Sequence, residues 1–96
     1  MEALVNLFFK ALRLYRRKYQ ISFQLYTLPA WVPSECAEIT FYNAGTSVAM
    51  IQNLPLLPSV QLSIGGNSNE IDVTAYNISF QPGGNNALYV IVKNYV

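Results

Sequence analysis

The chain has no histidine and a single cysteine, Cys36, among its 96 residues. Without histidine it lacks the side chain that most often serves as a general acid or base near neutral pH. One cysteine cannot form a disulfide within the chain, and alone it cannot build a Cys/His zinc site. These counts exclude histidine-based catalysis, disulfide scaffolds and Cys/His zinc sites.

Charge is also scarce, because charged residues make up 11% of the chain against roughly 25% in an average soluble domain. Hydrophobic residues make up 52%, which excludes intrinsic disorder. Five of the six basic residues lie within positions 1–18, whereas four of the five acidic residues lie beyond them. The length suits one domain, and the uneven charge predicts two segments with different surroundings.

Residues 1–20 are predicted to form an amphipathic helix that precedes a β domain over residues 21–96. No glycine or proline interrupts positions 1–28, and apolar side chains recur with a 3.6-residue period. The apolar side of this helix comprises Leu4, Leu7, Phe8, Ala11, Leu12, Leu14, Tyr15 and Tyr19. Lys10, Arg13, Arg16 and Arg17 lie opposite, and Lys18 interrupts the apolar side near its end.

This helix is expected to be an anchor or assembly element. Its charges follow the apolar run, unlike those of a signal peptide, and the run is too short to cross a bilayer. Three partners for the helix stay open. It packs on its own domain or on a neighbouring subunit, it lies on an anionic membrane, or it contacts nucleic acid, which is the least favoured of the three. The residues assigned to this contact are Leu4, Phe8, Leu12, Lys10, Arg13, Arg16, Arg17 and Lys18.

From Ile21 the hydrophobic period changes from 3.6 to 2, which is typical of half-buried strands. Strands are predicted over 21–26, 38–42, 47–52, 60–64, 70–74, 76–81 and 87–96, with 29–37 as an irregular connection. A hairpin is expected to join 38–42 to 47–52 through the turn around Gly45, and Pro55 and Pro58 to mark a bend. This spacing predicts an all-β fold, a small antiparallel sandwich or jelly-roll-like barrel, with one N-terminal helix.

The predicted core takes one side of each strand: Ile21, Phe23, Leu25, Ile39, Phe41, Val48, Met50, Val60, Leu62, Ile64, Ile71, Val73, Ile78, Phe80, Leu88, Val90 and Val92. The outward positions are mostly uncharged, and aromatic residues without charge are typical of surfaces that a neighbour covers. The aromatic residues proposed for such an interface are Trp31, Tyr42, Tyr76, Tyr89 and Tyr95. For Trp31, a plug at the edge of the core is favoured over an exposed platform. The apolar run 87–92 is an aggregation hazard unless a neighbouring strand pairs with it.

No catalytic, cofactor-binding or metal-binding residue is predicted, and the chain is interpreted as non-enzymatic. Asn67, Asn69, Glu70 and Asp72 offer oxygen ligands for calcium, but their spacing matches no established loop, so a turn leading into a strand is favoured. Cys36 has no histidine or basic neighbour in sequence, which favours an inert thiol over a nucleophile.

Several segments between Glu38 and Gln81 resemble a known family. They are Ile39-Thr-Phe-Tyr-Asn-Ala-Gly-Thr, Val48-Ala-Met-Ile-Gln-Asn, Leu56-Leu-Pro-Ser, Leu62-Ser-Ile-Gly-Gly-Asn, Asn69-Glu-Ile-Asp and Tyr76-Asn-Ile-Ser-Phe. This order is similar to that of small β-domain structural proteins of bacteriophage virions, especially phages of Bacteroidetes-type hosts.

The resemblance implies a virion protein: a penton, spike-base or decoration component that forms a homo-oligomer and contacts other capsid proteins. The helix is then expected to dock on the capsid or on a membrane. The alternative is a carbohydrate- or peptide-binding β-sandwich module that uses Trp31 and the tyrosines.

Overall fold

The protein is described by a computed structural model that covers residues 18–67 and 70–96. These residues form eight strands, β1 (Tyr19–Tyr26), β2 (Ala30–Pro33), β3 (Glu38–Asn43), β4 (Ala49–Ile51), β5 (Leu54–Leu56), β6 (Gln61–Gly65), β7 (Ala75–Phe80) and β8 (Leu88–Tyr95). No helix occurs among them, and so none that could cross a membrane. Residues 1–17 of the predicted N-terminal helix lie outside the described residues; Lys18 is described, and the last two positions, Tyr19 and Gln20, belong to β1.

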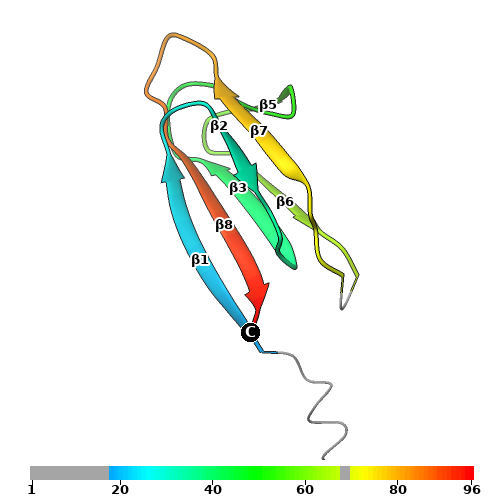
Figure 1. The fold of residues 1–96 in the computed structure, drawn as a ribbon. Helices are drawn as coiled ribbons and strands as arrows, with labels where there is room; N and C mark the ends of the chain where they lie inside the picture. The colour runs from blue at the N-terminus through cyan, green and yellow to red at the C-terminus, as the bar shows by residue number, and fades with distance from the viewer. Residues whose placement is uncertain (1–17, 68–69) are drawn as a thin grey trace, which may run out of the picture.

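The eight strands pair as nested antiparallel partners: β1 with β8, β2 with β7, β3 with β6 and β4 with β5. Further pairing of β3 with β8 and of β4 with β7 divides them into two four-stranded sheets, β1-β8-β3-β6 and β2-β7-β4-β5 (Figure 1). This nested order is the strand arrangement of a jelly roll. The prediction of an all-β fold with antiparallel sheets is therefore confirmed.

Two short strands contain prolines that were expected to exclude strand structure. Pro33 ends β2 and Pro55 lies in the middle of β5, and both strands are edge strands of the second sheet. An edge strand tolerates proline because the missing N–H can face away from its one partner. The predictions of an irregular connection over 29–37 and a simple bend at Pro55 were therefore wrong.

The predicted hairpin between the third and fourth strands was also wrong, because β3 and β4 lie in different sheets. Asn43 is fully buried and stabilises the turn through which the chain passes from the first sheet to the second. Its side-chain Nδ2 donates to the backbone oxygens of Ser47 (2.8 Å) and Leu56 (2.9 Å), and its Oδ1 accepts from the Gly45 N–H (3.0 Å). The expected strand over 70–74 is reduced to one isolated bridge between Asp72 and Cys36.

The core lies between the sheets and is made of Val32, Cys36, Ile39, Phe41, Ala49, Ile51, Leu56, Tyr76, Ile78, Leu88 and Val90. The rings of Phe41 and Tyr76 pack edge to face with centroids 5.3 Å apart. In β4 the predicted side was inverted, because Ala49 and Ile51 are buried while Met50 is only half-buried. The predicted core residues Val60, Ile71 and Val73 are exposed, since all three lie outside the strands.

The apolar run at the C-terminal end of the fold has neighbours on both sides. β8 lies between β1 and β3, so its backbone hydrogen-bonding groups are paired within the chain. The aggregation hazard expected for residues 87–92 therefore does not apply to β8. The edge strands of this sheet are β1 and β6, and β1 is the edge strand that pairs with β8 (Figure 1).

Candidate assembly interface

β1 turns its apolar side chains away from the core. Its register with β8 places Ser22 beside Val92 and Gln24 beside Val90, so these polar residues occupy the core side. Ile21, Phe23 and Leu25 consequently lie on the outer side, where Phe23 is 69% exposed. Their prediction as core residues was wrong, because alternation along a strand defines two faces without identifying the buried one.

The outer side of the first sheet carries an apolar surface, here called the outer apolar face. It consists of Tyr19, Ile21, Phe23 and Leu25 of β1 with Tyr89, Ile91 and Tyr95 of β8. The strand register aligns these residues in rows, with Phe23 opposite Ile91 and Leu25 opposite Tyr89. Tyr42 of β3 extends the second row from Tyr89, so the predicted interface residues Tyr42, Tyr89 and Tyr95 lie on one side of this sheet.

The face becomes polar toward β6. Thr40 of β3 forms a hydroxyl–hydroxyl hydrogen bond of 2.9 Å with Ser63 of β6. The Lys93 Nζ lies 4.5 Å from the centre of the Tyr19 ring, a cation–π contact that covers part of the ammonium charge. Glu38 is directly opposite Lys93 across the strand pair, so the cation and the acid lie in one row. This side of the sheet is therefore close to neutral and most apolar at β1.

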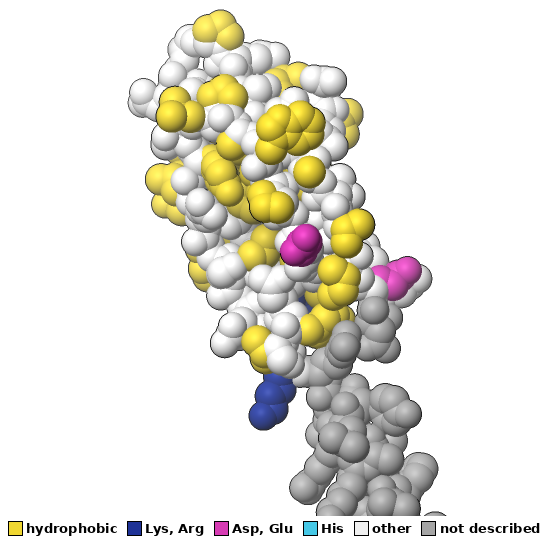
Figure 2. Space-filling model, viewed as in Figure 1, with side chains coloured by type: hydrophobic (Ala, Val, Ile, Leu, Met, Phe, Trp, Pro, Cys, Tyr) yellow, Lys and Arg dark blue, Asp and Glu magenta, His cyan; other side chains and the backbone are white. Residues whose placement is uncertain are grey.

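The opposite side of the molecule is also poor in charge. The view in Figure 2 shows hydrophobic side chains scattered among uncharged polar ones, with few charged groups. Natural sheets commonly place lysine or other charges on their edge strands, which prevents uncontrolled pairing. Between Lys18 and Glu35 the sequence contains no charged residue, so β1 and β2 both lack this protection.

One edge of β1 has no partner strand in the described part of the chain. The Val96 N–H donates to the Lys18 carbonyl oxygen (3.0 Å), which fixes which residues of β1 face β8. Because hydrogen-bonded and non-hydrogen-bonded pairs alternate, Gln20, Ser22 and Gln24 direct their backbone groups toward β8. Tyr19, Ile21, Phe23 and Leu25 direct theirs to the free edge, and these are the residues whose apolar side chains are exposed.

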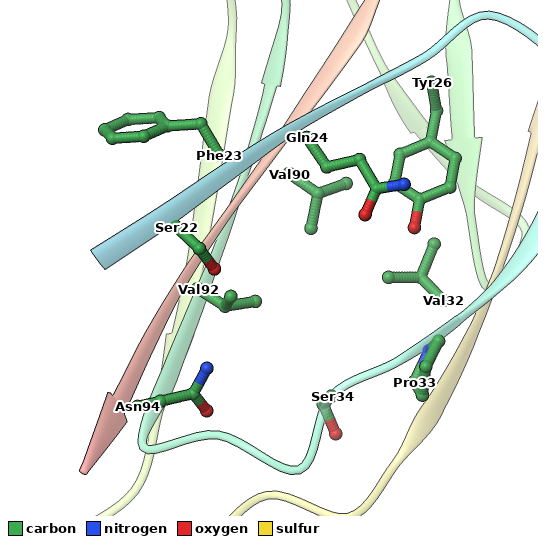
Figure 3. A pocket seen from close by; sticks show the side chains of 10 residues that line it. All are labelled: Ser22, Phe23, Gln24, Tyr26, Val32, Pro33, Ser34, Val90, Val92 and Asn94. Atoms are coloured by element: carbon green, nitrogen blue, oxygen red, sulfur yellow. The ribbon is translucent and has the colours of Figure 1, made fainter. Parts of the chain in front are cut away.

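A hollow of about 290 Å³ lies between the sheets beneath β1 (Figure 3). Its lining combines uncharged polar residues, Ser22, Gln24, Tyr26, Ser34 and Asn94, with apolar ones, Val32, Pro33, Val90 and Val92. Phe23, which borders the same space, points away from it to the outer side of β1 (Figure 3). The sandwich is thus open below its edge strand, where short polar side chains replace the apolar ones that would close it.

Two of the five predicted interface aromatics lie elsewhere. Trp31 is 68% exposed on β2, in the second sheet, so its prediction as a plug of the core was wrong. It lies on the other sheet from Tyr42, Tyr89 and Tyr95, and a single platform of Trp31 with the tyrosines does not form. Tyr76 is only 6% exposed and packs on Phe41, so its assignment to a surface was wrong.

The Tyr76 hydroxyl has a structural role in the core. It donates a hydrogen bond to the Asp72 carboxylate, whose other oxygen accepts from the Thr74 N–H (2.8 Å). Hydrogen bonds from Tyr76 and Thr74 lower the pKa of Asp72, against a smaller opposing effect of burial. Burial, followed by the hydrogen bond to Asp72, raises the pKa of Tyr76 to about 12.

The residues considered for calcium are occupied by other contacts. Glu70 accepts from the Asn67 N–H, and both carboxylate oxygens of Asp72 accept hydrogen bonds; Asn69 lies outside the described residues. Across 18–67 and 70–96 no group of three acidic, cysteine or histidine side chains is arranged to hold a metal ion. Cys36 is buried, and burial with the nearby Asp72 raises the pKa of its thiol. That the thiol is inert stays a prediction.

Of the basic residues assigned to docking, only Lys18 is described; it is exposed and directly precedes β1. Leu4, Phe8, Lys10, Leu12, Arg13, Arg16 and Arg17 lie outside the described residues. Sequence reasoning missed the outer apolar face because it assigned Ile21, Phe23 and Leu25 to the core. The uncharged run from Tyr19 to Ser34 was the one sequence signal that could have identified an unprotected edge.

Comparison with protein-family models, with curated proteins and with solved structures finds no match for this chain.

Proposed function

We propose that this protein is a non-enzymatic structural component of a virion, associated with the capsid as a penton, spike-base or decoration subunit. In this role it assembles as a homo-oligomer and contacts other capsid proteins. Its N-terminal segment, predicted to be a helix, docks on the capsid or on a membrane surface.

The observation that carries this proposal is the outer apolar face on an edge strand without charge. A soluble monomer rarely leaves so many adjacent apolar side chains in water, and larger patches of this kind mark interaction sites. The cores of protein interfaces are depleted in charge and enriched in aromatic residues. The outer apolar face has the same composition, with the exposed aromatic residues Tyr19, Phe23 and Tyr89. Covering this face with other protein removes it from water.

The fold gives weaker, associational support. Jelly rolls recur in viral capsid proteins, but they also occur in lectins and other binding proteins. A fold therefore does not assign the function by itself, and the outer apolar face is the stronger support. The basic residues at positions 10–18 fit docking on an anionic partner, because Lys and Arg near such a surface are attracted to it.

Native mass spectrometry of the full chain, together with electron microscopy, tests the assembly. Discrete closed oligomers are expected, and a protein that stays monomeric at high micromolar concentration overturns the proposal. Docking is tested by cosedimentation with vesicles that contain anionic lipid. Binding that decreases in the triple variant Arg13→Gln, Arg16→Gln and Arg17→Gln but persists in Lys93→Gln, which removes a β8 charge, assigns the contact to the N-terminal segment.

The hollow beneath β1 favours a second candidate, a carbohydrate-binding module. Gln24, Ser22 and Asn94 surround it with uncharged donors and acceptors that make no side-chain hydrogen bond to the described chain, and Val90 and Val92 supply an apolar floor. This combination suits a neutral, hydroxyl-rich ligand. A glycan-array signal that is lost in Gln24→Ala but kept in Trp31→Ala would place a sugar in the hollow, whereas the reverse pattern would place it on the second sheet.

A further inference from the structure

We propose that β1 pairs along its free edge with β1 of a second copy of this chain, in an antiparallel arrangement about a two-fold axis at Ser22. The two first sheets then form one continuous sheet across the dimer. This inference rests on the proposed function, since it specifies how two copies of a self-assembling subunit meet.

The hydrogen-bonding groups needed for this pairing are present, and no described residue pairs with them. Tyr19, Ile21, Phe23 and Leu25 direct their N–H and C=O groups to the side of β1 opposite β8. In the described chain no strand occupies that side. A second strand running antiparallel satisfies these groups, because each hydrogen-bonded pair exchanges two N–H···O bonds.

One register pairs all four of these residues with strand residues of the partner. With Ser22 opposite its own copy, Ile21 lies opposite Phe23 of the second chain, and Tyr19 lies opposite Leu25. If the axis is at Ile21 or at Phe23 instead, one of these four residues lies opposite a position of the second chain that is outside β1. The bounds of β1 therefore select the register centred on Ser22.

The side chains that meet in this register are compatible on both faces. On the outer side, apolar residues of one copy continue the rows of the other, which doubles the outer apolar face. On the inner side, Ser22 meets Ser22 and Gln20 meets Gln24, so only uncharged polar groups are opposed. The nearest cation, Lys18, lies opposite Tyr26 of the second chain, and the two Lys18 residues are at opposite ends of the paired strands.

The symmetry allows a cross-linking test with a matched control. Across the new edge Ser22 forms a non-hydrogen-bonded pair with its own copy, and such pairs have Cα atoms about 4.5 Å apart. This separation lies within the range of disulfides, about 4.4–6.8 Å. Gln24 is on the same side of β1 but is displaced from its own copy by roughly 13 Å, four residues at about 3.3 Å each.

Mild oxidation of the full chain carrying Ser22→Cys is expected to give a covalent dimer, whereas Gln24→Cys does so at least roughly tenfold more slowly, because its thiols lie beyond disulfide reach. Cys36 does not interfere, since it is buried. Equal cross-linking of both variants, or none in an otherwise oligomeric chain, overturns edge pairing and leaves the proposed assembly in place. A chain that is monomeric by native mass spectrometry overturns both.

A second pair of variants tests the backbone contact itself. Ile21→Pro removes an N–H that faces the free edge and leaves the hydrogen bonds to β8 in place, whereas Ile21→Ala loses the side chain and keeps the N–H. The proline variant is expected to dimerise roughly tenfold more weakly than the alanine variant, equivalent to one or two net hydrogen bonds. Equal dissociation constants for the two variants would overturn the pairing.

Discussion

Two phenylalanines on strands of the same sheet provide the sharpest test of which side of β1 faces water. Phe41 of β3 is fully buried and packs against Tyr76, whereas Phe23 of β1 is 69% exposed. Replacing each by alanine deletes the same atoms from the two sides of the first sheet. Phe41→Ala should destabilise the folded monomer, and Phe23→Ala should instead weaken self-association.

The magnitudes follow from burial. Deleting a buried phenylalanine side chain typically costs about 3–5 kcal/mol, a large part of the roughly 5–15 kcal/mol that stabilises a small domain. Phe23 already has most of its surface in water, so its replacement should change the free energy of unfolding by about 0.5 kcal/mol. Covering its exposed part, roughly 140 Å² of a side chain of about 200 Å², would contribute about 3 kcal/mol to association.

Urea unfolding followed by circular dichroism measures the first effect, at a protein concentration low enough for the monomer to dominate. Sedimentation velocity over a range of concentrations measures the second, for which a dissociation constant weakened by roughly a hundredfold is expected in Phe23→Ala. If Phe23→Ala lost as much unfolding free energy as Phe41→Ala, β1 would bury its apolar side. If association were unchanged, the outer apolar face would not be the contact.

Three further outcomes follow from buried contacts. Asn43→Asp places a carboxylate against two backbone carbonyls and should lower the free energy of unfolding by about 3 kcal/mol at neutral pH, with partial recovery in acid, as measured by urea titration. Because the folded pKa of Asp72 is lowered, its stabilising effect is present above its ordinary value of 3.8 and is lost as the pH falls through the folded value. Tyr76→Phe should therefore lose stability at neutral pH and show a shallower decline in acid, and an unchanged decline would contradict the role of this hydrogen bond. Cys36 should react with an aromatic disulfide reagent only on unfolding, so rapid labelling of the native protein would show that its burial is incomplete.

The parts of the fold that sequence predicts best are the strands with strict alternation. In β3, Ile39 and Phe41 were correctly placed in the core, because the strand lies inside a sheet and one side must be buried. β2 and β5 escaped prediction because each contains a proline, and a sequence does not indicate that a strand lies at an edge. The turn around Gly45 has the composition of a hairpin turn, yet it connects two sheets.

The sequence predicted that the interface would be aromatic and uncharged, but not which strands and which side of the sheet would form it. Tyr42 and Tyr89 were expected to be covered by a neighbour and do lie opposite each other on the outer side of one sheet. The exposure of Phe23 depends on its alignment with Ile91, a residue far along the chain. Local periodicity contains no information on such a long-range register, and this is why the most exposed aromatic ring of β1 was assigned to the core.

The nested order of strands determines when, during synthesis of the chain, the free edge of β1 becomes ordered. Among the described strands, β1 is the first to leave the ribosome, but the one strand that pairs with it, β8, is the last of them. Pairs so distant in sequence form late, because a long loop must close before they can contribute. The edge that we propose to join two copies is therefore ordered only after all eight described strands have been made. Assembly through β1 would then be restricted to chains in which β8 has been made and has paired with β1, and chains that lack β8 would be unable to recruit a second copy.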